Sequence, residues 1–377
     1  MTIVADAPTP VDTVEITLGI DTHADTHVAA VIDPLGRHLG QASFDTTVAG
    51  FKALLAWATE FGTITVAGVE GTGAYGAGLA RFLTVEGVTV VEVDRPDRKA
   101  RRDHGKSDPI DAYAAARAAA SGRASGTPKS RTGDVESVRV LRVARTGAVR
   151  ARAKALTQLK AMIVTSPDAL RAQLRGLDGT DLVATCARLR SVRDEPPTPS
   201  PFAKRAPRPG RLIDPTAATK RSLASIAGRV QALTIEIAEL DDDRDALLTP
   251  LAPTLLALQG VGLDVAGQLL VTAGDNPERL RNEAAFAHLC GAAPIPASSG
   301  KTSNRHRLNR GGDRAANAAL YVIVLSRLRW DERTRVYVER RTKQGHSKKE
   351  IIRCLKRYIA REVFAAINAD LNAPITP

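Results

Sequence analysis

Four acidic residues have positions in the sequence that suit a single metal-binding cluster. Asp21 ends the run EITLGID, in which apolar residues alternate, and Glu70 ends a second strand-like run, TITVAGVE, just before a Gly-Thr-Gly turn. Asp108 and Asp111 stand at the start of KSDPIDAYAAARAAA, a helix-like segment in which residues three apart share one face. Two strand ends and one helix turn can converge on a point, so we expect the four side chains to meet.

The chemistry of such a cluster follows from its charge. Four carboxylates in one place would repel one another unless divalent cations neutralised them, and oxygen ligands suit Mg²⁺ or Mn²⁺. Two such ions can stabilise both the attacking and the leaving oxygen of a phosphodiester. The acidic set therefore predicts metal-dependent chemistry on nucleic-acid phosphates.

Each carboxylate also has a purely structural explanation. Asp21 could cap a turn, and Glu70 could be an ordinary polar residue at a strand end. Asp108 followed by Pro109 has the pattern of a helix N-cap, and Asp111 would favour the positive end of the helix. Asp21 is the least typical of a cap, because acidic residues are depleted in strands and the run before it is strongly apolar. The strand, strand, helix order of all four favours the metal site.

Charge is unevenly distributed along the 377 residues, which exceed the usual size of one domain and predict two or three. The net charge of +12 divides into −5 for residues 1–125, +8 for residues 126–250 and +9 for residues 251–377. An acidic region followed by two basic ones fits a polyanion whose backbone is bound away from the carboxylates. A soluble basic surface would have the same composition, and charge does not distinguish DNA from RNA.

The cysteines and the N-terminus indicate the compartment. Cys186, Cys290 and Cys354 stand far apart without zinc-ligand spacing, so neither a zinc site nor a disulfide framework is expected, and a reducing cytoplasm is the simplest location. Residues 1–12 lack the basic and apolar parts of a signal peptide and are expected to form a disordered tail. No apolar run approaches the length of a membrane span.

Residues 13–125 are expected to fold as strands that alternate with helices. Predicted strands cover 14–21, 27–33, 37–44, 63–70 and 88–93, and predicted helices cover 47–61, 75–86 and a segment that begins at Asp108. Three antiparallel strands followed by alternating helices and strands, with acids at strand ends, is the ribonuclease H-like (RuvC-like) arrangement. The fold class is thus α/β in this domain, followed by helical regions.

Residues 126–250 change to a helical pattern. A helix is expected over about 135–165, and a second helix carries an a/d seam of Leu223, Ile226, Val230, Leu233, Ile237, Leu240 and Leu247. Between the two helices, residues 194–215 hold seven prolines, which exclude a regular helix or a central strand. We expect two helices of an antiparallel coiled coil or bundle, which either form a hairpin within one chain or serve as a dimerisation arm.

Residues 251–377 are expected to be mainly helical and to contact nucleic acid. Two helices joined around Gly260–Gly262 have the form of a helix-hairpin-helix, although simple helix packing explains the turn equally well. A basic segment rich in Ser, Gly and Asn follows, and the chain ends in a strongly basic helical stretch whose charges could instead be a solvated helix face. The candidate nucleic-acid contacts are Lys301, Arg305, Arg307, Arg310, Arg314, Lys348, Lys349, Arg353 and Arg357.

Two separated sets of motifs resemble those of a known family, the DEDD transposases of the insertion-sequence 110 family, which are bridge-RNA-guided serine recombinases. The N-terminal set is GIDTHADTHVAAVID, VEGTGAYG and KSDPIDAYAAA. The C-terminal set is the Gly260–Gly262 turn, GAAPIPASSGKTSNRHRLNRGGDRAANAALY and RRTKQGHSKKEIIRCLKRYIAREVF. The resemblance covers most of the chain except the N-terminal tail and the proline-rich insert. Ser107 and Asp313 depart from the residues most common in the family and leave the chemistry unaffected.

The resemblance implies a mechanism and a set of partners. The serine of Pro294-x4-Ser299-Gly300 would be the nucleophile, helped by a base or a metal because a serine hydroxyl is a poor nucleophile at neutral pH. It would attack DNA and form a phosphoserine link while Asp21, Glu70, Asp108 and Asp111 hold Mg²⁺, with Mn²⁺ as an alternative. Donor DNA, target DNA and a structured guide (bridge) RNA would be the partners. The working unit would be a homo-oligomer, dimer or tetramer, with a site shared between subunits, acting at the nucleoid in a bacterial cytoplasm.

Two other functions stay open on the residues alone. A ribonuclease H-like DNA endonuclease or Holliday-junction resolvase would need the four acids but would use a metal-activated water in place of Ser299. A nucleic-acid-binding protein with a decayed acidic domain would need neither, and the intact set of four acids argues against it.

Overall fold

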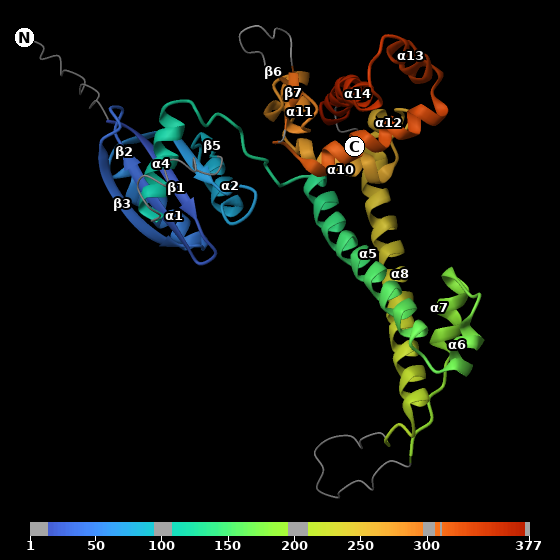
Figure 1. The fold of residues 1–377 in the computed structure, drawn as a ribbon. Helices are drawn as coiled ribbons and strands as arrows, with labels where there is room; N and C mark the ends of the chain where they lie inside the picture. The colour runs from blue at the N-terminus through green and yellow to red at the C-terminus, as the bar shows by residue number, and fades with distance from the viewer. Residues whose placement is uncertain (1–13, 94–107, 195–209, 297–305, 310, 374–377) are drawn as a thin grey trace, which may run out of the picture. The chain divides into compact units, whose positions relative to one another are not determined.

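The computed structural model of the chain describes residues 14–93, 108–194, 210–296, 306–309 and 311–373 (Figure 1). The expected N-terminal tail and most of the proline-rich insert lie outside these residues. The chain divides into two compact units, one formed by residues 1–136, 258–260 and 268–377 and the other by residues 137–257 and 261–267.

A five-stranded mixed sheet organises the N-terminal domain. Its strands are β1 (Glu15–Thr22), β2 (Thr26–Ile32), β3 (His38–Asp45), β4 (Thr63–Glu70) and β5 (Val90–Val93). They lie in the order β3-β2-β1-β4-β5, with β1 to β3 antiparallel and with β4 and β5 parallel to β1. The predicted three-strand meander is confirmed, and the mixed sheet agrees with the predicted ribonuclease H-like class.

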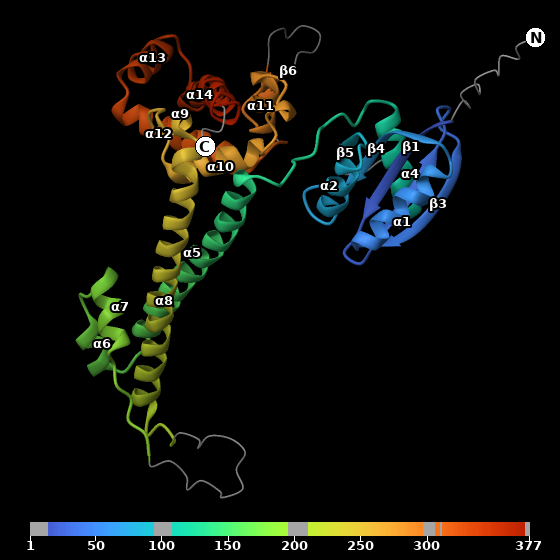
Figure 2. The same ribbon diagram turned by 180° about the vertical axis from the view of Figure 1, so that it is seen from behind.

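Helices cover both faces of this sheet (Figure 2). On one face, α1 (Val48–Thr59) and α2 (Ala77–Val85) pack against the buried apolar side chains of β1 and β4. On the other face, α4 (Asp108–Ala120) packs its alanines and Tyr113 on β2. Because the central strand β1 is covered on both faces, its residues from Ile16 to Asp21 are all buried, the polar Thr17 included.

Two glycines allow α4 to lie unusually close to the sheet. A Cβ atom on Gly19 of β1 would stand 2.2 Å from the carbonyl oxygen of Ala112, and one on Gly68 of β4 would stand 2.6 Å from that of Ala115. A side chain at either position would therefore push α4 away from the strands. This contact fixes where the first turn of α4, with its two aspartates, meets the end of β1.

Two long helices dominate the second unit, as predicted. They are α5 (Asp134–Val164) and α8 (Pro215–Leu251), and the chain between them adds α6 (Asp168–Leu174) and α7 (Gly179–Ala187), which the sequence did not reveal. The lower part of α8 shares an apolar core with α5, α6 and α7 (Figure 1). Further along α8, Leu233, Leu240 and Leu247 are only partly buried, so a continuous coiled-coil seam stays a prediction.

The C-terminal region is mainly helical where the structure describes it, with a short antiparallel pair of strands. It contains α9 (Pro253–Leu256), α10 (Leu263–Ala273), a 3₁₀ turn η1 (Pro277–Arg279), α11 (Glu283–Leu289), β6 (Pro294–Pro296), β7 (His306–Leu308), α12 (Arg314–Trp330), α13 (Glu332–Lys343) and α14 (Lys348–Leu371). The predicted turn joins α9 to α10, with Gly260 at φ +86°, but the first helix is a single turn. Among the described helices, none has the length and apolar character needed to cross a membrane.

Candidate metal centre

The parallel pairing of β1 and β4 brings two of the predicted acids to one edge of the sheet. Ile20 pairs with Val69, and Asp21 and Glu70 are the next residues of the two strands. The Oγ1 hydroxyl of Thr22 donates a hydrogen bond to the carbonyl oxygen of Glu70 across the strand ends, at 2.9 Å. Strand register alone therefore places the two residues next to each other at this edge.

The first turn of α4 supplies the other two acids. Asp108 is the first residue of the helix and its side chain is about half exposed, whereas Asp111 is 4% exposed and Asp21 is 7% exposed. Moving a carboxylate out of water is costly unless a hydrogen bond, a charge or a metal compensates for the lost hydration. Two largely buried carboxylates near a partly open edge are suited to a bound cation.

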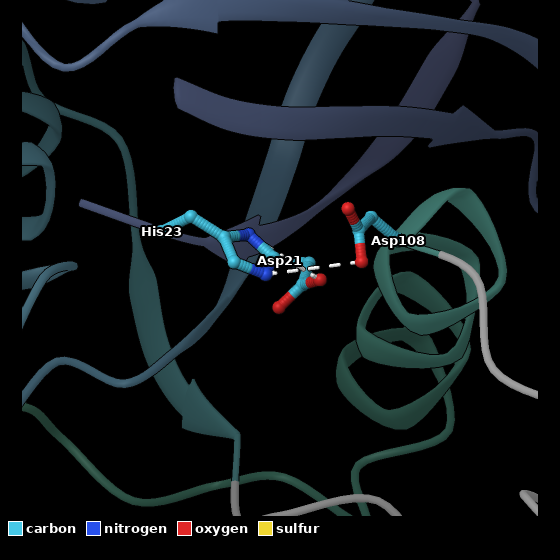
Figure 3. Close-up of side chains that lie close together, drawn as sticks. All are labelled: Asp21, His23 and Asp108. Carbon is cyan, nitrogen blue, oxygen red and sulfur yellow. Dashed lines mark ion pairs between the residues drawn. The ribbon is translucent and has the colours of Figure 1, made fainter. Parts of the chain in front are cut away.

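His23 lies close to two of these acids, Asp21 and Asp108, in the structure (Figure 3). Its Nδ1 is 3.8 Å from Oδ2 of Asp21, and its Nε2 is 3.8 Å from Oδ1 of Asp108. One ligand atom from each of the three residues falls within 4.8 Å of the others, a spacing that a single metal ion can bridge. The group combines a strand end, the turn that follows it and a helix start.

The structure thus brings two of the four predicted acids close together. Asp21 and Asp108 belong to the close group with His23, while Glu70 at the neighbouring strand end and Asp111 one turn along α4 are not members of it. A four-acid metal cluster therefore stays a prediction, although all four residues lie on the elements expected to bring them together.

The C-terminal candidates are only partly described. Ser299, Lys301, Arg305 and Arg310 lie outside the described residues. Arg314, Lys348 and Lys349 are exposed at the starts of α12 and α14, which suits a contact with a polyanion. The other three line a cavity described below: Arg307, Arg353 and Arg357.

His23 is the residue that sequence reasoning missed. It stands two positions after Asp21 in GIDTHADTH, and its backbone N–H donates to the carbonyl oxygen of Thr26 at 3.1 Å, which closes the turn between β1 and β2. The Asp-x-His pattern at a strand end is the sequence feature that could have identified His23 as a candidate ligand. His27 in the same motif has a different environment, because it is fully buried, stacks on Phe51 with ring centroids 5.6 Å apart, and has its pKa lowered by burial.

The donor set fits a divalent cation. Carboxylate oxygens suit Mg²⁺ and Mn²⁺, whereas an imidazole nitrogen is a better ligand for Mn²⁺ than for the harder Mg²⁺. With His23 close to both Asp21 and Asp108, this chain would hold an ion through oxygen and nitrogen together. His23 should therefore shift the preference of the site toward Mn²⁺.

Replacing His23 is expected to lower the affinity for Mn²⁺ more than the affinity for Mg²⁺. In His23→Ala protein we expect Mn²⁺ affinity to fall by about tenfold, in the range seen when residues around a metal are changed, with little change for Mg²⁺. Isothermal titration calorimetry on the full-length protein measures both. His288→Ala, at an exposed position on α11, is the control and should bind both ions normally. An equal loss for both ions in His23→Ala would show that the imidazole supports the fold and is not a ligand.

Two family models match this chain in the same order as its domains. A model described as a transposase, of the DEDD IS110 type, matches residues 18–166 and includes the whole candidate metal centre. A second model, described as the transposase IS116/IS110/IS902 family, matches residues 252–339, which begin just before the Gly260–Gly262 turn and contain Ser299. The gap between the two matched stretches, residues 167–251, contains α6, α7 and the whole of α8.

Proteins of two insertion elements are similar to parts of the chain. One is the uncharacterised 43.6 kDa protein of insertion element IS110 from Streptomyces coelicolor, 30% identical over 145 residues, which are 38% of this chain and 36% of that protein. Another is the uncharacterised 42 kDa protein of insertion element IS900 from Mycobacterium paratuberculosis, 25% identical over 198 residues, which are 51% of this chain and 47% of that protein. The matched region thus spans less than half the length of either relative.

Proposed function

Because the chain belongs to the IS110 family of transposases, we propose that it cuts and rejoins the donor and target DNA of an insertion element. The observation that carries the proposal is the placement of acidic side chains at two parallel strand ends and at the first turn of α4, with Asp21, Asp108 and His23 close enough to share an ion. This arrangement is suited to chemistry at a phosphodiester.

The carboxylates have a binding and orienting role in this proposal. Asp21, Glu70, Asp108 and Asp111 would hold Mg²⁺ or Mn²⁺, which when bound stabilises negative charge on the phosphate and on the oxygens that enter and leave it. The two buried acids, Asp21 and Asp111, are held by β1 and by the glycine-dependent packing of α4, so their positions do not depend on a flexible loop. Rigid placement of this kind is what an enzyme needs to orient a reacting phosphate.

Ser299 is the proposed nucleophile. Its Oγ would attack the phosphorus of the strand to be cut, so that a P–O bond to serine forms and the P–O bond to a sugar oxygen breaks. The serine proton would pass to a base, and the departing sugar oxygen would take up a proton. The phosphoserine link would conserve the energy of the broken bond, and a DNA hydroxyl would later reverse the step and rejoin a strand. The family's serine motif, Pro294-x4-Ser299-Gly300, supports this assignment.

A structured guide RNA would supply the sequence specificity. Net charges of +8 and +9 in the second and third regions, against −5 in the first, suit a protein that binds nucleic-acid backbones and leaves base recognition to RNA–DNA pairing. The same charges suit a homo-oligomer that holds donor and target DNA together.

A reconstituted reaction tests the proposal. Purified protein, Mg²⁺, plasmids with the donor and target sites, and the RNA transcribed from the element's non-coding end are expected to give recombinant DNA. Omitting the RNA should abolish the product, and an RNA with scrambled guide segments is the matched control. If recombination proceeded equally well without RNA, guidance would be refuted. If linear products with free ends were the sole outcome, a metal-dependent endonuclease or resolvase would be the better assignment.

A further inference from the structure

A basic cavity lies in the C-terminal region, away from the candidate metal centre in the sequence. It has a volume of about 900 Å³ and is lined by the Gly291–Pro294 segment, strand β7, the end of α13 and the first half of α14. Sites for small ligands commonly fall between about 300 and 1,000 Å³, so a group the size of one nucleotide fits within it.

Cations dominate the lining of this cavity. Arg307, Arg341, Arg353, Lys356 and Arg357 contribute to it, and among the described lining residues Glu350 is the one acid. The carboxylate of Glu350 accepts hydrogen bonds from the backbone N–H and the hydroxyl of Ser347, both at 2.8 Å, and so caps α14. The excess of positive charge favours an anionic ligand.

A chain of hydrogen bonds holds Lys356 at the cavity wall. Its Nζ donates to Oδ1 of Asn317 at 2.7 Å, and Nδ2 of Asn317 donates to the carbonyl oxygens of Cys290 at 2.9 Å and Gly291 at 3.1 Å. The ammonium also lies 5.1 Å from the centre of the Tyr321 ring. Burial lowers the pKa of Lys356, because the charged form has lost hydration, and an anion in the cavity would compensate for that loss.

Two guanidinium groups have nitrogen atoms with unused hydrogen-bonding capacity. Arg357 binds Glu283 through Nη2 at 3.0 Å, but its Nη1 is buried and has no hydrogen-bond partner among the described residues. Arg341 donates a hydrogen bond from Nη1 to Gln344 at 2.8 Å. Its buried Nε has no hydrogen-bond partner among the described residues. A buried N–H group without an acceptor destabilises the protein, and a phosphate oxygen in the cavity would supply the missing acceptor.

An aromatic ring completes the lining. Tyr358 of α14 is 51% exposed and packs edge-on against Tyr337, with ring centroids 5.7 Å apart. It lines both the main cavity and a smaller adjoining hollow of about 250 Å³. Aromatic rings next to cationic groups are the usual platform on which bases of single-stranded nucleic acid stack.

We propose that this cavity binds one unstacked nucleotide of the DNA strand that is cut, with its phosphate against Lys356 and Arg357 and its base on Tyr358. DNA is favoured over an acidic peptide because the exposed ring suits a base, and because Pro294 in the lining begins the motif that contains Ser299. The inference rests on the proposed function and adds a strand-holding site to it.

Photocrosslinking tests the placement of the base. Full-length protein in EDTA, which prevents metal-dependent cutting, is mixed with a single-stranded DNA oligonucleotide that carries 5-iododeoxyuridine, and is then irradiated. We expect the crosslinked peptide to contain Tyr358. Normal binding with crosslinks only at other residues would overturn the proposal, and so would a stronger crosslink at Tyr358 from an RNA oligonucleotide of the same sequence.

Affinities of variants test the energetics. Tyr358→Leu should bind the DNA about tenfold more weakly, and Tyr358→Phe should bind nearly as well as the wild type. Lys356→Met should lower the slope of log affinity against log salt by about 0.7, the value for one phosphate contact with a single strand. Trp330→Leu and Lys343→Met, at exposed positions that do not line the cavity, are the controls.

The outcomes separate this inference from the proposed function. Unchanged affinity and salt slope in Tyr358→Leu and Lys356→Met, with Asp21-dependent cutting intact, would remove the cavity from the mechanism and leave the transposase assignment in place. If wild-type protein bound no single-stranded DNA, the cavity inference alone would fail. The proposed function would fail only if the reconstituted reaction with plasmids and RNA also gave no cut DNA.

Discussion

Asp21→Ala protein is expected to cut DNA at least about 1,000-fold more slowly than the wild type while it keeps its fold and its affinity for DNA. Asp21 is the acid at the end of the central strand and is 7% exposed, and it belongs to the close group with His23 and Asp108. Loss of a ligand that positions a charge-stabilising ion removes several kcal/mol of transition-state stabilisation, and about 4 kcal/mol corresponds to a factor of about 1,000 in rate. Single-turnover cleavage of end-labelled DNA in Mg²⁺ measures the change.

Asp25→Ala is the matched control for this prediction. Asp25 has the same side chain four residues away, but it is exposed in the turn between β1 and β2 and is not part of the close group. The control should cut at the normal rate. In metal-free buffer, thermal unfolding of Asp21→Ala should occur at the same temperature as the wild type or higher, because one repulsive charge has gone. Full activity of Asp21→Ala would remove Asp21 from the site, and a lower melting temperature would assign it a structural role instead.

The sequence was most informative about the acidic residues of the candidate metal centre, because each of them stands at the predicted end or start of an element. The alternating run before Asp21 and the Gly-rich turn after Glu70 predicted two strand ends, and Asp108-Pro109 predicted a helix start, each within one or two residues of the observed bounds. In the structure these two strands are parallel neighbours, so their ends meet at one edge of the sheet. Local periodicity therefore predicted where the acids stand in their elements, and the strand pairing brings Asp21 and Glu70 next to each other.

What the sequence did not reveal depends on contacts between distant segments. His23 gains its significance only when α4 brings Asp108 to within 3.8 Å of its ring, and α4 can approach only because Gly19 and Gly68 leave room. The cavity in the C-terminal region likewise joins α13, α14 and strand β7, and its two buried guanidinium nitrogens become apparent only in three dimensions. Residue type predicted that Arg353 and Arg357 are basic contacts, but not that they enclose a volume with Tyr358.

Stalled reactions are expected to contain DNA joined covalently to this protein at Ser299. The hypothesis rests on the family membership and on Pro294-x4-Ser299-Gly300 in a basic, Gly-rich stretch. Substrates with a nick close to the cut site should trap the link, because the departing fragment diffuses away before it can rejoin. The adduct should survive denaturation, should need Mg²⁺ and an intact Asp21, and should map by peptide sequencing to Ser299. Ser298→Ala, with the neighbouring hydroxyl removed, is the matched control and should form the adduct normally. Free DNA ends without a protein adduct under every trapping condition would identify water as the attacking group.

Mixing two inactive variants is expected to restore part of the activity if the serine of one subunit acts with the carboxylates of another. Ser299→Ala protein keeps the acids of the N-terminal domain, and Asp21→Ala protein keeps the serine of the C-terminal region. In a mixed dimer, one of the two shared sites would then be complete, so we expect some strand cleavage to return once subunits have exchanged. The adduct in the mixture should lie on the Asp21→Ala subunit, which a size tag on either variant reveals. A mixture as inactive as its components, with subunit exchange shown by co-purification of the tags, would place both parts of the site in one chain.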